Sequence, residues 1–197
     1  MKKDCFILGW VYFGLMFILE AVLPEWMGNE NGVIENLQIL WFFAGIWYCY
    51  KMASTPMHDW GGEQSFLWYA GSIFFLLLAG REVSWGRAFF WHADGRMYKY
   101  SDMGLYGQLV HPMVGALLVL VLFLLWRGKI VAFLKSIKFP TIDFALLLLF
   151  ILMGWVGEKA NIALFHGMLA EELAEFGAYM MMFQIVRRIG EYMQNKK

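Results

Sequence analysis

The sequence predicts an all-α membrane protein, a polytopic bundle of six transmembrane helices with both termini on the cytoplasmic side (N-in, C-in). Of its 197 residues, 60% are hydrophobic and only 16% are charged, whereas soluble domains are roughly 45–50% apolar and about 25% charged. The apolar residues come in blocks of about 20, the length of helix that crosses a bilayer. Sixteen basic residues balance sixteen acidic ones, so the net charge does not indicate a nucleic-acid partner.

The six apolar blocks form a single predicted membrane domain that covers residues 1–197. Proline and glycine separate the blocks, with Pro24, Pro56 and the segments 86–107 and 128–140 typical of connections. The predicted spans lie near residues 5–23, 33–50, 66–85, 108–126, 142–162 and 168–186.

The basic residues orient the bundle. With a cytoplasmic N-terminus, 11 of the 16 Lys and Arg residues fall on the cytoplasmic side, as the positive-inside rule requires. The acidic residues partition the opposite way, with 5 inside and 11 outside or at the outer helix ends. Because acids contribute little to insertion topology, their accumulation on the outer side calls for another reason.

Every predicted helix brings polar side chains to its outer end, while the inner halves contain almost no ionisable group. Proton and ion pathways need polar groups throughout the bilayer, so the pattern favours a one-sided site over a conduit. Hydrated side chains at headgroup level are the alternative explanation for each residue taken singly. The outer group comprises Glu20, Glu35, Gln38, Arg81, Glu82, His111, Glu158, Asn161, His166, Glu171, Glu172 and Glu175.

The first functional hypothesis is an enzyme, a metal-assisted hydrolase or transferase that acts on a lipid or lipid-linked substrate at the membrane surface. A carboxylate in an apolar rim can act as a general base, so the candidate catalytic residues are Glu82, His111, Glu171 and Glu175. Imidazole beside carboxylates is a common metal-ligand set, which makes His111, His166, Glu171 and Glu175 the candidate ligands of a divalent metal. A histidine satisfied by a neighbouring glutamate is the alternative for either imidazole.

Arginines supply the candidate contacts to substrate. Arg81 and Arg87 would hold an anionic head group, and Trp85 and Glu35 complete the predicted substrate-binding set. His92, in the loop after the third span, is expected to be an ordinary surface residue.

Two other classes of function stay open. One is a non-catalytic binding or accessory subunit that docks a partner membrane protein or a cofactor. Haem would suit the arginines as propionate partners, but a site this rich in glutamate suits haem poorly. The other is a cation or proton transporter that works as an oligomer, which the apolar inner halves disfavour.

Three segments carry a resemblance to a known group of proteins. Residues 30–35 read E-N-G-V-I-E, residues 81–86 read R-E-V-S-W-G, and residues 171–175 read E-E-L-A-E. They resemble small bacterial multi-pass membrane proteins of no assigned activity, which show E-D-G-x-x-E, E-E-x-S-W-G-Q-R and E-E-x-x-E segments. The chain departs from this pattern at Asn31, Arg81 and Arg87.

The resemblance covers about a sixth of the chain. It implies a location in the bacterial inner membrane and a shared site built from the matching side chains, without specifying its chemistry. Those side chains are Glu35, Glu82, Trp85, Glu171 and Glu175.

Overall fold

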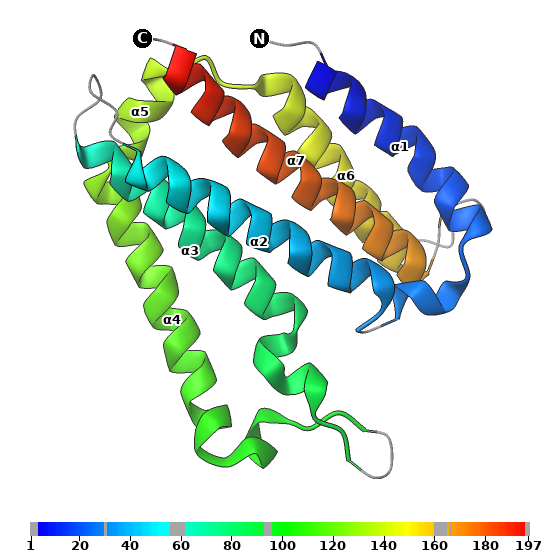
Figure 1. Ribbon diagram of the computed structural model, residues 1–197. Coiled ribbons are helices and arrows are strands. Elements are labelled where there is room, and N and C mark those ends of the chain that lie inside the picture. Colours follow the sequence, from blue (N-terminus) through cyan, green and yellow to red (C-terminus); the bar gives the residue numbers. More distant parts are fainter. Residues whose placement is uncertain are drawn as a thin grey trace. The chain divides into compact units, whose positions relative to one another are not determined.

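Helices build nearly all of the chain that the structure describes. The computed structural model describes residues 4–29, 31–55, 62–92, 96–159, 165 and 167–195 (Figure 1). Within these ranges there is no strand, and an isolated antiparallel bridge joins Trp91 and Met97. The predicted all-α class is therefore confirmed.

Each predicted span coincides with one long helix. These helices are α1 (Asp4–Val22), α2 (Val33–Ser54), α3 (Ser65–Glu82), α4 (Gly104–Arg127), α6 (Thr141–Lys159) and α7 (Met168–Asn195). Helix α5 (Ile130–Ser136) lies in a segment that the sequence predicted to be a connection. Short 3₁₀ segments are η1 (Glu25–Gly28), η2 (Gly62–Gln64), η3 (Ser84–Phe89) and η4 (Tyr100–Met103).

Three helical stretches are long and apolar enough to cross a membrane: Gly62–Phe89, Tyr100–Arg127 and Thr141–Lys159. The stretch Ile7–Val22 is apolar but shorter. These lengths and compositions indicate a membrane protein, because about 20 apolar residues match the bilayer core.

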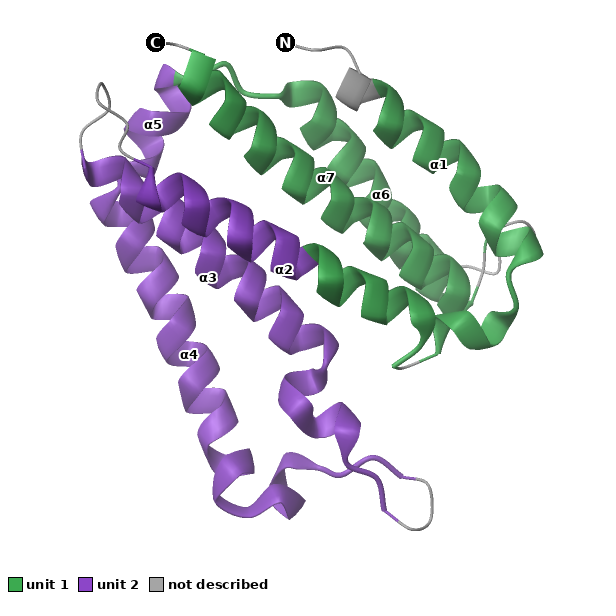
Figure 2. Cartoon of the chain, viewed as in Figure 1, with its two compact units in different colours: residues 1–41, 137–197 green, residues 42–136 purple. Residues whose placement is uncertain are grey.

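The chain divides into two compact units (Figure 2). Unit 1 comprises residues 1–41 and 137–197, and unit 2 comprises residues 42–136. The division passes through α2, so this helix contributes its first half to unit 1 and its second half to unit 2.

Unit 1 is organised by the close packing of α6 against α7. A Cβ added to Gly177 would lie 2.5 Å from the Phe150 ring, and one added to Gly157 would lie 3.0 Å from the backbone nitrogen of Glu171. Small residues let two helices approach in this way, and in a membrane such packing replaces the hydrophobic drive that water would supply. Helix α1 and segment η1 also contact α7.

A buried ion pair joins α6 and α7 at the opposite end from Gly157. The Arg188 Nη1 atom lies 2.7 Å from Asp143 Oδ2, and only 2% of the Asp143 side chain is exposed. The pairing is antiparallel, since Gly157 meets Glu171, Phe150 meets Gly177, and Asp143 meets Arg188. Burial of one of these charges without the other would be strongly unfavourable, so the pair fixes the register of the two helices.

Unit 2 is built on the contact of α3 with α4. Its buried cluster contains Ala70 and Leu77 from α3 and Val121 from α4. The second half of α2 joins this unit through a hydrogen bond from Ser72 Oγ to the Ile46 carbonyl, at 3.2 Å. The end of α3, the start of α4 and the segment that joins them therefore belong to the same compact unit.

The α6–α7 contact makes a testable prediction. We expect Gly177→Ala to lower the free energy of unfolding by about 1–3 kcal/mol, because the new methyl group must displace the Phe150 ring. Gly154→Ala is the matched control, since its Cβ would meet only ordinary contacts at 3.8 Å and alanine favours the helix by up to about 1 kcal/mol. Thermal unfolding in detergent compares the two variants. Equal stability of both would show that the helices are not in tight contact at Gly177.

Candidate functional site

A left-handed turn ends α3 in unit 2. The backbone φ angles are 44° at Ser84, 50° at Trp85 and 82° at Gly86. Only glycine adopts this region without cost, so two successive non-glycine residues there represent stored strain. The Trp85 ring lies against Gly80, where an added Cβ would be 2.6 Å from it, and packs on the apolar α3–α4 cluster.

Two tyrosines from the start of η4 and α4 hold this turn in place. The Tyr100 hydroxyl donates to the Ser84 carbonyl at 2.8 Å, and the Tyr106 hydroxyl donates to the Trp85 carbonyl. The Arg87 guanidinium lies over the Tyr100 ring, 5.2 Å from its centre, in a cation–π contact. The buried Nε atom of Arg87 has no hydrogen-bond partner among the described residues.

Beside the turn lies a cavity of about 480 Å³. This volume falls within the range of sites that bind small molecules or parts of larger ones. The lining is mostly apolar and aromatic, with one carboxylate. It is formed by Gly86, Phe90, Tyr98, Asp102, Met103 and Tyr106, all of unit 2.

A histidine–carboxylate pair stands at the cavity. The Nε2 atom of His92 lies 3.5 Å from Asp102 Oδ2, and the His92 ring is 4.1 Å from the Tyr98 ring, centre to centre. Asp102 also accepts from the backbone nitrogen of Lys99 at 3.0 Å and from Ser101 Oγ at 3.1 Å. In a serine-hydrolase triad the histidine would stand between serine and aspartate, whereas here Asp102 stands between His92 and Ser101.

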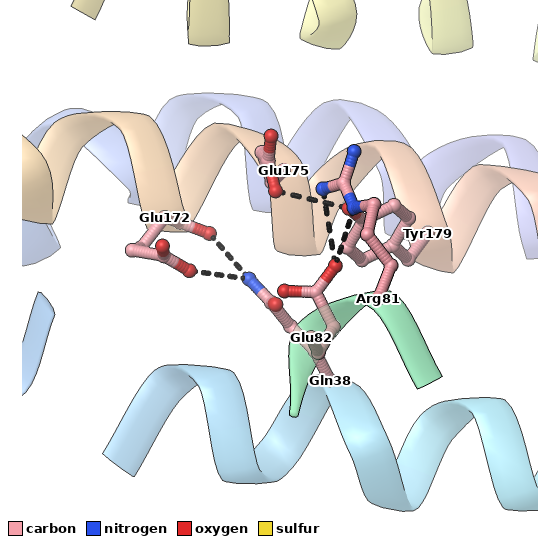
Figure 3. Close-up of polar contacts among 6 residues, drawn as sticks. All are labelled: Gln38, Arg81, Glu82, Glu172, Glu175 and Tyr179. Carbon is pink, nitrogen blue, oxygen red and sulfur yellow. Dashed lines mark hydrogen bonds and ion pairs between the residues drawn. The ribbon is translucent and has the colours of Figure 1, made fainter. Parts of the chain in front are cut away.

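The predicted acidic residues make defined contacts in both units (Figure 3). In unit 2, Arg81 Nη2 lies 3.0 Å from Glu82 Oε1, and Glu82 is buried with 8% of its surface exposed. In unit 1, the Tyr179 hydroxyl donates to Glu175 Oε2 at 2.9 Å. Arg81 therefore neutralises the buried Glu82 carboxylate. An unpaired carboxylate buried to this extent would be strongly unfavourable.

Gln38 is the polar residue of unit 1 that is buried most completely, with 0% of its surface exposed. Its Nε2 donates to Glu172 Oε2 at 2.9 Å and to the Glu172 carbonyl at 3.2 Å (Figure 3). Because both partners are acceptors, they determine which end of the amide carries the nitrogen. The contact fixes the first half of α2 to the start of α7.

The four candidate metal ligands are divided between the two units and the residues outside the described part of the chain. No group of three or more His, Cys, Asp and Glu side chains that could hold a metal ion occurs among the described residues. His111 belongs to unit 2, while Glu171 and Glu175 belong to unit 1. His166 and Asn161 lie outside the described residues, so the four-ligand set stays a prediction.

The remaining predicted residues have local partners. The Glu35 carboxylate accepts from the backbone nitrogen of Asn31 at the start of α2. His111 lies in the second turn of α4, with its ring 5.2 Å from the Tyr100 ring. Glu171, in the first turn of α7, is half-buried where Gly157 approaches its backbone.

Sequence reasoning missed two features of the structure. Asp143 and Arg188 were counted only as cytoplasmic charges, although an acid at the start of one apolar helix and a base near the end of the next are the signal of an antiparallel pair. His92 was expected to be an ordinary surface residue, whereas it pairs with Asp102. The distance between His92 and Asp102 along the sequence matches no motif that would have predicted this pair.

The turn that follows α3 gives a second prediction. Changing both tyrosines, Tyr100→Phe with Tyr106→Phe, removes two hydrogen bonds worth about 1 kcal/mol each, so amide hydrogens of residues 83–90 should exchange about tenfold faster or more. Hydrogen–deuterium exchange read by mass spectrometry measures this change. Tyr69→Phe on α3 is the control and should leave the exchange unaltered. Unchanged exchange in the double variant would mean that the hydroxyls do not hold the turn.

Comparison of the chain with protein-family models, with curated protein sequences and with solved structures gives no match. The resemblance carried by the three segments therefore stays an expectation from the sequence. Any functional conclusion rests on the geometry of the site itself.

Proposed function

We propose that the chain is a six-span, N-in and C-in protein of the bacterial inner membrane that binds a lipid or lipid-linked molecule at its outer surface. The observation that carries the proposal is the mostly apolar cavity of about 480 Å³ beside the left-handed turn of unit 2. Its place at the end of α3 and the start of α4 corresponds to headgroup level in the proposed topology. Aromatic side chains are typical of that level.

The lining suits an amphiphile. Phe90, Met103 and the tyrosine rings offer apolar surface to a chain or glycerol backbone. Arg87 follows the lining residue Gly86 in the chain, stacks on Tyr100 and is partly exposed. A phosphate or carboxylate on the bound molecule would pair with the positive charge of its guanidinium.

Ligand binding would explain why the backbone of the turn is strained. Left-handed residues persist where the surrounding structure over-determines them, and they cluster at ligand sites. Gly86 lines the cavity, and hydrogen bonds from the two tyrosine hydroxyls fix the turn beside it. The geometry thus supports a preformed binding site.

Photocrosslinking tests this function. The full chain is placed in nanodiscs of phosphatidylethanolamine and phosphatidylglycerol that contain a diazirine-bearing phosphatidylglycerol, and adducts are mapped by mass spectrometry. We expect adducts on residues 86–106. Phe90→Asp should reduce their yield about tenfold, because a carboxylate then replaces apolar lining.

Phe89→Asp is the matched control. Phe89 is the neighbouring residue, is 67% exposed and does not line the cavity. It should keep the wild-type yield. The proposal fails if both variants lose the adduct equally, or if the wild type gives no adduct in this segment.

A hydrolase or transferase is the second candidate function, and the His92–Asp102 pair favours it. Asp102 can hold the His92 ring in position, so that His92 takes a proton from water as that water attacks an ester of the bound lipid. The proton would then pass to the oxygen of the departing alcohol. The bond broken is the ester bond, and no redox partner is needed.

Turnover of a fluorescent phosphatidylglycerol tests the enzymatic candidate. We expect His92→Gln to lower the rate about 100-fold, the usual scale for loss of a general base. Tyr69→Phe on α3, which changes a side chain outside the cavity lining and away from the His92–Asp102 pair, is the control and should keep most of the rate. Full activity in His92→Gln would contradict the role of His92. Absence of wild-type turnover would remove the enzymatic candidate and leave the binding function intact.

A further inference from the structure

Unit 1 contains a second cavity, of about 500 Å³, which no part of the proposed function uses. It lies at the turn that joins η1 to α2 and along the first two turns of α2. The lining residues are Trp26, Asn29, Asn31, Gly32, Val33, Asn36, Leu37 and Leu40. None of these described lining residues is charged, unlike the lining of the cavity in unit 2.

Three carboxamides form the polar part of this cavity. Asn36 Nδ2 donates to the carbonyls of Asn31 and Gly32, at 3.1 and 2.8 Å, which leaves its Oδ1 as the acceptor end. The side chain of Asn29 is exposed and makes no hydrogen bond with the described residues. Neutral amides can both donate to and accept from hydroxyl groups, whereas a phosphate would favour arginine or lysine.

Trp26 adds a flat aromatic surface to the amides. It is 60% exposed, although tryptophan has a large apolar ring system that proteins usually cover. The face of an aromatic ring carries negative charge density, so it attracts the slightly positive C–H face of a sugar ring. A ring platform with uncharged donors and acceptors around it is therefore suited to a sugar.

An apolar stripe leaves the cavity along α2. Val33, Leu37 and Leu40 share one face of the helix at i, i+4 and i+7, and their exposed fractions are 39%, 46% and 64%. A hydrocarbon chain attached to the sugar could lie along this stripe. The cavity thus joins a polar head site to an apolar track.

We infer that this cavity binds an uncharged sugar carried on a lipid. The inference goes beyond the proposed function and is independent of it, because all its residues belong to unit 1. The ligand class is a neutral glycolipid or a lipid-linked sugar whose first ring meets Trp26 and the asparagines.

Native mass spectrometry tests the inference on the full chain. The protein is placed in phosphatidylglycerol nanodiscs with equal small amounts of monoglucosyl diacylglycerol and diacylglycerol, and the retained lipids are counted after release. The wild type should retain the glucosyl lipid in preference to diacylglycerol and to phosphatidylglycerol. Trp26→Ala and Asn29→Ala should each lower that retention about fivefold or more, because each removes one direct contact to the sugar.

Trp126→Ala is the matched control, since Trp126 is 71% exposed on α4 and lies outside this cavity. It should keep wild-type retention, and circular dichroism should show the same helix content in all variants. Equal retention of diacylglycerol would reduce the site to an apolar track and overturn the inference. A preference for phosphatidylglycerol would also overturn the inference. The same holds if Trp26→Ala and Asn29→Ala retain the glucosyl lipid as the wild type does.

A free sugar offers the same ring and hydroxyl groups without a lipid, so it is the alternative ligand for this cavity. Methyl glucoside at millimolar concentration should fail to displace the glucosyl lipid, because it lacks the chain that lies on Val33, Leu37 and Leu40. Complete displacement would overturn the assignment of a lipid-borne ligand.

Discussion

The close antiparallel contact of α6 with α7 is the constraint on which the architecture of unit 1 depends. Glycines at 157 and 177 bring the two backbones together, and the buried Asp143–Arg188 pair sets their register at the other end. Charges inside a bilayer are costly unless they are paired, so a one-turn slip would lose both the packing and the pair. Helix α1 and segment η1 then pack on the surface that this pair of helices presents.

Hydropathy located all six long helices because an apolar block of bilayer length is the strongest signal a membrane sequence carries. It could not show which of them are apolar enough to cross a membrane. Helix α7 contains six acidic or basic residues, and it buries small residues, Met and Gln184 instead of a continuous apolar surface. Helix α5 was missed because lysines at 129, 135 and 138 make its segment resemble a polar connection.

The partners of the predicted acidic residues were only partly foreseeable. Arg81 precedes Glu82 in the sequence and could be expected to neutralise a carboxylate, whereas Gln38 as the partner of Glu172 and Tyr179 as the partner of Glu175 emerge only when the helices are built. The left-handed turn at Ser84 and Trp85 could not be predicted either, because neither residue prefers that conformation. Tertiary contacts from Tyr100 and Tyr106 impose it, and they arise about 20 residues later in the chain.

The proposed topology places the opening of the cavity beside this turn on the outer side of the membrane. Cysteine labelling tests it most directly, in a Cys5→Ser, Cys49→Ser background with Ser101→Cys near the cavity or Ser136→Cys at the end of α5. A membrane-impermeant maleimide applied to intact bacterial spheroplasts should label the first variant at once and the second only after the membrane is permeabilised. Labelling in the reverse order, or of both variants in intact spheroplasts, would contradict the account.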